Sequence, residues 1–128
     1  MRPKSDTLTA QELEIMKVIW PREQATVREV YDALRERRSI AYTSVQTMMN
    51  VLESKGHLAR HAAERAHVYT PVRPQQTVVR SMVREFVDRV FDGSARPLLV
   101  HLLKDKQLNA RDRRELQQLI DRLEKEDE

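Results

Sequence analysis

Three threonines in the first half of the chain are each followed, three residues later, by Glu or Gln and then by apolar residues at helical spacing. The pairs are Thr9 with Glu12, Thr26 with Glu29 and Thr43 with Gln46. In such a capping box the two side chains satisfy backbone N–H groups that a helix start leaves without partners. Pro21 is expected to end the first helix, and Gly56 is the expected C′ residue of the third. The sequence therefore predicts three capped helices before residue 57.

The residues that follow predict a β-hairpin and then three more helices. Two short segments, 57–62 and 67–71, lie on either side of the charged tip Glu64-Arg65. Beyond residue 74, apolar residues recur at i, i+3, i+4 and i+7, with Gly93 ending one helix and Ser94 and Asn109 capping the next two. The predicted fold class is mainly α with a small β-hairpin: a winged helix-turn-helix domain over residues 1–73, followed by helices over 74–128.

The helices of the segment 74–128 are predicted to join two copies of the chain. So short a segment cannot enclose a sufficient core alone, so its apolar stripes must be covered by the first domain or by a partner chain, and we expect the partner. The predicted dimerisation residues are Val79, Met82, Val83, Phe86, Val90, Leu99, Leu102, Leu103, Leu116, Leu119 and Ile120.

Composition narrows the classes of function. The chain has no Cys, which excludes disulfides, thiolate catalysis and Cys-ligated zinc. It has no apolar run typical of a signal peptide or a membrane span, so a cytoplasmic protein is expected. Residues 1–73 hold 12 Lys and Arg against 9 Asp and Glu, whereas residues 74–128 hold 11 of each. The basic excess therefore falls in the first domain, as suits contact with a polyanion.

The third predicted helix carries short neutral polar groups where a surface helix normally carries Lys and Glu. Val45, Met48, Met49 and Leu52 are expected to face inward. The second helix of a helix-turn-helix motif enters the major groove, where base edges offer hydrogen-bonding positions and thymine offers a methyl group. No Arg on this face could bind guanine in a bidentate way, so an A·T-rich site is predicted. The predicted base-reading residues are Thr43, Ser44, Gln46, Thr47 and Asn50.

Basic and tyrosine side chains near this helix are predicted to contact the DNA backbone. Such contacts fix the register of a protein on DNA without reading its sequence. The predicted backbone contacts are Arg28, Arg38, Tyr42, Lys55, Arg60 and Arg65.

Five blocks of the sequence together resemble the penicillinase-repressor family, also called BlaI/MecI/CopY. They are LTAQELEIMKVIW, ATVREVYDAL, IAYTSVQTMMNVLESKGHL, RAHVYTPV and VFDGSARPLLVHLL, in order between residues 7 and 123. The resemblance implies a homodimeric winged-helix repressor on a palindromic operator with TACA/TGTA-type half-sites. It also places the five predicted base-reading residues on the family's recognition helix and Arg65 in its wing, while Val51 stands where many members have Arg.

The resemblance further implies release by an upstream signal. In penicillin-responsive members a membrane sensor peptidase triggers cleavage at an Asn-Phe bond in the dimerisation region. This chain has no Asn-Phe pair, and residues 94–101 occupy the neighbourhood instead. Copper-responsive members use a C-terminal Cys-rich metal site, which the absence of Cys excludes.

Other chemistries find little support in the sequence. His57, His61 and His67 lie close in sequence, but if residue 62 pairs with 67 then His61 and His67 lie on opposite faces of the hairpin, and no metal site is predicted. No catalytic motif or cofactor-binding loop is present, so neither an enzyme nor a cofactor is expected. Two alternatives to the repressor are a ligand-responsive winged-helix regulator and a protein-interaction module without specific DNA binding.

Overall fold

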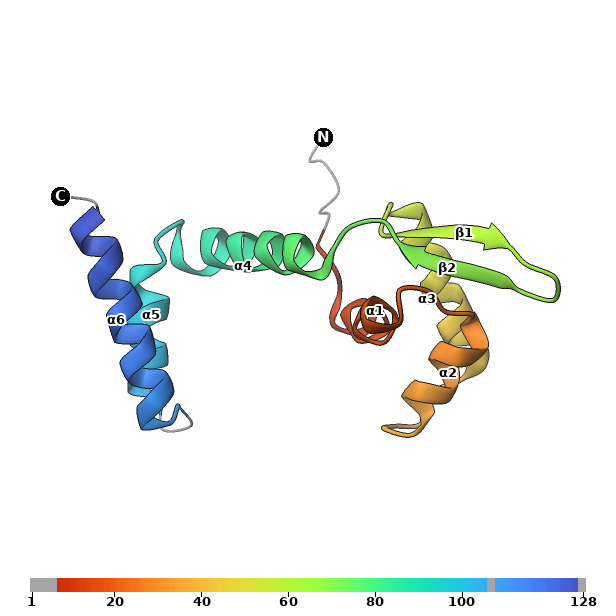
Figure 1. Ribbon diagram of the computed structural model, residues 1–128, viewed down its shortest axis with the longest axis horizontal. Coiled ribbons are helices and arrows are strands. Elements are labelled where there is room, and N and C mark those ends of the chain that lie inside the picture. The colour runs from red at the N-terminus through yellow and green to blue at the C-terminus, as the bar shows by residue number, and fades with distance from the viewer. Residues whose placement is uncertain (1–6, 106–107, 127–128) are drawn as a thin grey trace. The chain divides into compact units, whose positions relative to one another are not determined.

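The computed structural model describes residues 7–105 and 108–126, and its contacts divide the chain into two compact units at residues 82 and 83 (Figure 1). The first unit holds α1 (Ala10–Arg22), α2 (Val27–Arg35), α3 (Tyr42–Ser54), β1 (Leu58–Ala62), β2 (His67–Pro71) and the start of α4 (Gln75–Phe91). The second holds the rest of α4, α5 (Arg96–Lys104) and α6 (Ala110–Glu126). The predicted order of three helices, a hairpin and three helices is confirmed.

Two of the three predicted capping boxes form. At α1 the N–H of Glu12 donates to Thr9 Oγ1 at 3.2 Å and the N–H of Thr9 donates to Glu12 Oε1 at 2.8 Å. Thr26 and Glu29 make the same pair of bonds at the start of α2, at 3.1 and 2.9 Å. The third box is wrong, because Ala41 is the N-cap of α3 and no side chain caps that helix. Its first turn closes on the Ala41 carbonyl, so that Thr43 already lies inside the helix.

The ends of α1 and α3 both lie at residues with left-handed backbone. Pro21 lies within the last turn of α1 rather than ending it, and Glu23, with φ 66°, stops the helix. Gly56 is the C′ residue of α3, as predicted, with φ 84°. Its N–H donates to Glu53 O at 3.0 Å and that of His57 donates to Leu52 O at 2.9 Å, the two bonds of a Schellman motif.

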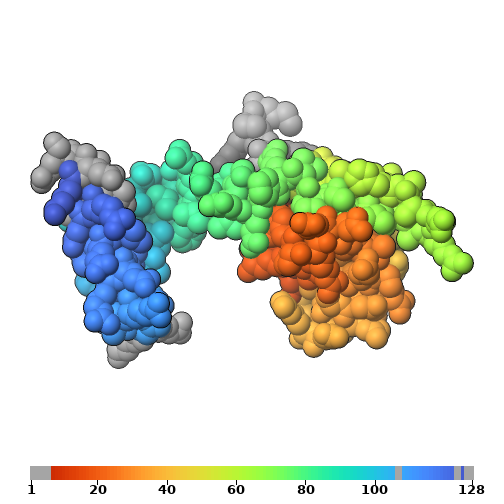
Figure 2. Space-filling view, in the orientation of Figure 1, coloured from red at the N-terminus to blue at the C-terminus, as the bar shows by residue number. Residues whose placement is uncertain are grey.

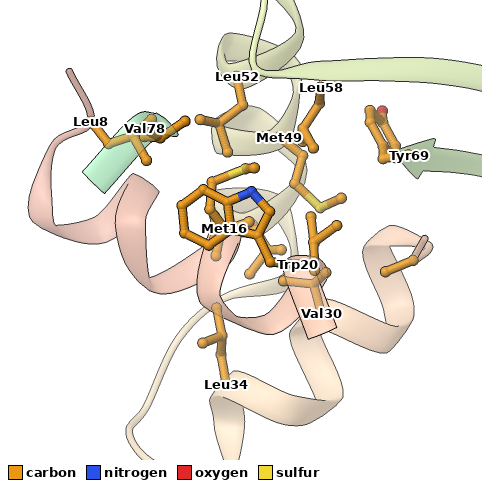
Figure 3. Packing of buried hydrophobic residues seen from close by; sticks show 14 residues of the cluster. Leu8, Met16, Trp20, Val30, Leu34, Met49, Leu52, Leu58, Tyr69 and Val78 are labelled. Carbon is orange, nitrogen blue, oxygen red and sulfur yellow. The ribbon is translucent and has the colours of Figure 1, made fainter. Parts of the chain in front are cut away.

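The core of the first unit draws on every one of its elements (Figure 3). Its buried hydrophobic residues are Leu8, Ile15, Met16, Ile19, Trp20, Ala25, Val30, Leu34, Val45, Met49, Leu52, Leu58, Tyr69 and Val78. Trp20 satisfies its indole N–H by donating to the carbonyl of Arg73 at 3.2 Å. Because Val78 belongs to this core, the first unit extends into α4, beyond the boundary after residue 73 that the sequence suggested.

The hairpin is antiparallel, with Ala62 opposite His67 and Leu58 opposite Pro71. This is the register assumed from the sequence. Ala25, just before α2, makes a short antiparallel bridge to Tyr69, with its N–H donating to the Tyr69 carbonyl at 3.0 Å and the reverse bond at 2.8 Å. The loop between the strands projects beyond the helices of the first unit (Figure 2).

In the second unit, two of three predicted helix signals hold. Gly93, with φ 87°, lies two residues past the end of α4, and Asn109 caps α6, since its Oδ1 accepts from the N–H of Asp112 at 2.7 Å. Ser94 does not cap α5, because Ala95 is the N-cap and the N–H of Ser94 closes a turn onto Phe91 O at 3.0 Å. Among the described residues, no helix is long and apolar enough to cross a membrane.

Candidate nucleic-acid interface

The structure gives α3 one buried side and one polar side. Val45, Met49 and Leu52 are fully buried, and Met48 is half-buried against the core. The five predicted base-reading residues are all exposed: Thr43, Ser44, Gln46, Thr47 and Asn50. They therefore share the outward side of one helix, and because the buried residues fix its rotation, that side cannot turn inward without opening the core.

Two arginines of α2 lie close to the first turn of α3. The guanidinium carbons of Arg28 and Arg35 lie 5.8 and 5.5 Å from the ring centroid of Tyr31, within cation–π range. Tyr31 in turn makes a T-shaped contact with Tyr42 of α3, at 5.5 Å between centroids. Asp32 pairs with Arg28 at 3.3 Å and with Arg35 at 3.8 Å, yet their side chains remain 66% and 55% exposed. The predicted contacts Arg28 and Tyr42 therefore belong to one exposed cluster.

Arg38 is held by a carboxylate of α1. Its guanidinium donates to Glu14 Oε1 through Nη2 at 2.8 Å and through Nε at 3.1 Å. This hydrogen bonding lowers the pKa of the Glu14 carboxyl below its ordinary value and raises that of Arg38. A DNA phosphate would have to compete with Glu14 for this arginine, which the sequence alone did not indicate.

Lys55 has a similar partner in a more buried place. Its ammonium donates to Glu12 Oε1 at 2.8 Å, and the Glu12 side chain is only 6% exposed. Burial raises the pKa of the Glu12 carboxyl, but the hydrogen bonds from Lys55 and Thr9 outweigh it, so the pKa lies below its ordinary value. Glu12 thus has two roles, as part of the α1 capping box and as an anchor for the C-terminal end of α3.

The hairpin carries the two remaining predicted backbone contacts. Arg60 on β1 pairs with Glu53 of α3 at 3.5 Å. Arg65 is exposed in the loop between the strands, as expected of a wing residue. His61 lies opposite Val68, and its Nε2 is 3.0 Å from Thr70 Oγ1. No group of three or more potential metal ligands occurs among the described residues.

Comparison with known proteins assigns the family. A family model described as penicillinase repressor matches residues 8–122. The chain belongs to the penicillinase repressor family. The penicillinase repressor of Bacillus licheniformis is 29% identical over 118 residues, covering 92% of each chain. The transcriptional regulator BlaI of Mycobacterium tuberculosis is 35% identical over 95 residues, covering 73% of this chain and 69% of that protein. The protein is thus a DNA-binding transcriptional repressor of this family and not an enzyme.

A solved structure supports the assignment of the first unit. The solution structure of the DNA-binding domain of the repressor BlaI has 34% sequence identity and a TM-score of 0.51. It covers 58% of this chain and 90% of that domain. The mainly helical fold with a winged helix-turn-helix is therefore confirmed.

The predicted dimerisation residues of this repressor are only partly covered within one chain. Val79, Val83, Phe86 and Val90 are 39–51% exposed along α4. Leu102 of α5 and Leu119 of α6 are 39% and 51% exposed. The remaining predicted residues are half-buried: Met82, Leu99, Leu103, Leu116 and Ile120. Apolar side chains this exposed, in a row on one helix, are typical of an interface.

Two contributors to the site were missed from the sequence. Tyr69 of β2 donates its hydroxyl hydrogen to Asn50 Oδ1 at 3.1 Å, joining the hairpin to the polar side of α3. Glu14 was not assigned any role, although it holds Arg38. The assumed hairpin register already placed Tyr69 opposite Arg60, but no sequence pattern states how far a tyrosine hydroxyl reaches across to a helix.

Proposed function

We propose that this repressor binds a palindromic operator as a homodimer, with one α3 in the major groove of each half-site. The observation that carries the proposal is the polar side of α3, where five exposed neutral side chains are backed by three fully buried residues. Thr, Ser, Gln and Asn can satisfy donors and acceptors on base edges, and the threonine methyl can contact that of thymine. An operator rich in A·T contacts follows, because α3 offers no Arg to guanine.

The backbone contacts divide into two groups by what already holds them. Arg28, Arg38, Lys55 and Arg60 each have a carboxylate partner within the chain, so a phosphate would have to replace or share that partner. Arg65 and Tyr42 are exposed, and Arg65 makes no ion pair among the described contacts. We therefore expect Arg65 and Tyr42 to contribute more to affinity than the other four.

Dimerisation through residues 74–128 follows from the exposed apolar row on α4 and its continuation on α5 and α6. A dimer that binds both half-sites gains affinity because, once one subunit is bound, the other meets its half-site at a high effective concentration. Relief of repression then requires loss of the dimer or of its hold on DNA. Residues 92–95, between α4 and α5, and the first two residues of α5 are all exposed, which makes this segment accessible to a peptidase. A membrane sensor peptidase that cleaves there would have to recognise a bond other than Asn-Phe.

The test is fluorescence anisotropy of the full chain titrated onto duplex DNA from its own upstream region, at two salt concentrations. Gln46→Ala and Thr47→Ala each remove one predicted base contact and leave the buried side of α3 untouched. We expect salt-dependent binding confined to a palindrome, and a loss of about 1–3 kcal/mol in either variant. Gln118→Ala is the matched control, since Gln118 is exposed on α6.

Each contrary result points elsewhere. Binding that ignores both the sequence and the α3 variants would leave a basic domain that binds DNA without specificity. No binding to any duplex, with a salt-insensitive protein partner instead, would favour a protein-interaction module.

A further inference from the structure

Tyr69 is fixed at the junction between the hairpin and the core. Tyr69 is 3% exposed and belongs to the buried cluster that also contains Leu58 and Met49 (Figure 3). Its backbone is held on both sides, by the β1 pairing to Arg60 and by two hydrogen bonds to Ala25. A side chain restrained in this way has little freedom to move its hydroxyl group.

That hydroxyl reaches the polar side of α3. It donates to Asn50 Oδ1 at 3.1 Å, across 19 residues of sequence. Asn50 is itself exposed, so one end of its amide contacts a buried anchor while the rest is open to solvent. The two ends of an amide are chemically opposite, since the carbonyl accepts hydrogen bonds and the NH2 group donates them. A tyrosine hydroxyl can donate or accept, but among the described contacts the hydrogen of the Tyr69 hydroxyl has no acceptor other than Asn50 Oδ1, so this pairing favours the carbonyl end of the amide.

We propose that Tyr69 is a specificity-determining positioning residue for base reading by Asn50. Its hydroxyl holds the Asn50 carbonyl toward the hairpin and leaves the NH2 group as the end offered to DNA. The acceptors that such a donor can meet in the major groove are purine N7, guanine O6 and thymine O4. The inference rests on the proposed function, because it requires α3 to lie in the groove.

Gln46 provides the contrast on the same helix. Its side chain is exposed, and no hydrogen bond holds its amide among the described contacts. It can present either end, or both ends at once, as adenine N6 and N7 require. Asn50 is oriented before DNA arrives and Gln46 is not, so loss of the Tyr69 hydroxyl should alter reading at one position only.

The experiment selects bound duplexes from a randomised pool with the full chain, and compares the base preferences of wild type and variants. Asn50→Ala identifies the base pair that Asn50 reads, where we expect about a tenfold loss of preference. Tyr69→Phe keeps the buried ring and removes only the hydroxyl. We expect it to lower the preference at that same base pair about threefold, with the rest of the motif and the affinity for non-specific DNA unchanged.

Two further variants keep the test decisive. Asn50→Asp still accepts from Tyr69 but offers an oxygen to DNA, so the preference at that base pair should shift toward adenine or cytosine, whose amino groups donate. It carries the test even where Tyr69→Phe folds poorly. Tyr31→Phe removes a hydroxyl that makes no described hydrogen bond, and should leave the motif unchanged.

The outcomes separate this inference from the proposed function. A wild-type chain that selects no motif would overturn both. A wild-type motif that Tyr69→Phe reproduces in full, or that Asn50→Asp leaves unchanged, would overturn the role of Tyr69 alone.

Discussion

The two regions of the chain, residues 7–82 and 83–126, are built from helices with the same apolar periodicity but differ in what covers the apolar side. In the first region Ile15, Ile19 and Val30 are completely buried. In the second, Val87 is the only hydrophobic residue buried among those described, while Val83, Val90 and Leu119 are about half exposed. The first region buries its apolar side chains within one chain. The second leaves most of them partly exposed, as expected of a surface that a second copy of the chain covers.

This difference shows what helical periodicity can and cannot tell. A stripe at i, i+3, i+4 and i+7 states which side of a helix is apolar, not which surface meets it. Where the cover comes from the same chain, stability does not depend on protein concentration. Where it comes from a second copy, folding and association are linked by mass action. The two regions should therefore respond differently to dilution.

The largest effect is expected from truncating the core of the first region. Ile15→Ala leaves a cavity in a fully buried site and should lower the free energy of unfolding by about 2–5 kcal/mol. Urea unfolding at two protein concentrations, followed by circular dichroism, measures this loss, which should be equal at both. Ile120→Ala on α6 is the matched control, and its cost should depend on concentration. A concentration-dependent cost for Ile15→Ala would show that the first region also relies on association.

A charge on the exposed side of α4 should break the proposed dimer. Phe86 is 40% exposed in the single chain and packs edge-on against Phe91, at 5.8 Å between centroids. Phe86→Asp would bury a carboxylate in the interface, so we expect the dimer dissociation constant to rise at least about 100-fold, by sedimentation velocity. Val72→Asp, at a 55% exposed apolar site of the first region, should change nothing. Dissociation by Val72→Asp would extend the interface into that region.

The sequence predicted most of the fold because its signals are local. The boxes at Thr9 and Thr26 and the cap at Asn109 each involve residues three apart, and each forms. Thr43 does not cap because it already lies inside α3, and Ser94 does not because α5 begins one residue later than predicted. The N-cap is an alanine at both sites, Ala41 for α3 and Ala95 for α5. A side chain alone does not determine where the chain turns into a helix.

The outward side of α3 was also predictable, since the buried side of a helix defines the other. What could not be predicted was the state of each polar group. Whether Arg38 is paired with Glu14, or Asn50 with Tyr69, depends on contacts across 24 and 19 residues of sequence. No pattern in one sequence encodes such distances.

Acid should lower the stability of the first region by protonating Glu12, whose carboxylate pairs with Lys55 and so joins α1 to the end of α3. The folded chain lowers the pKa of Glu12, so the stability from this carboxylate is complete above its unfolded value, near 4.5, and is lost as the pH falls through the folded value. Urea unfolding at pH about 7 and about 3 measures the free energy of unfolding. Between these pH values wild type should lose about 1–2 kcal/mol more of it than Glu12→Gln, whose side-chain oxygen can still accept the capping hydrogen bond from the Thr9 N–H. Glu14→Gln should remove a smaller part, because its pair with Arg38 is more exposed. Equal pH dependence in wild type and Glu12→Gln would contradict this assignment.

The smallest effect is expected from removing one helix N-cap in each region, and it compares the two regions most directly because the same kind of hydrogen bond is lost in both. Thr26→Ala takes the cap from α2, and Asn109→Ala takes it from α6. Each should lower stability by about 1 kcal/mol. Because α2 contributes to a core within one chain, the loss in Thr26→Ala should be the same at every protein concentration. The loss in Asn109→Ala should instead appear as a weaker dimer, measured by thermal unfolding over a dilution series. If both losses were independent of concentration, the second region would be stable without a partner, and its exposed apolar side would need another explanation.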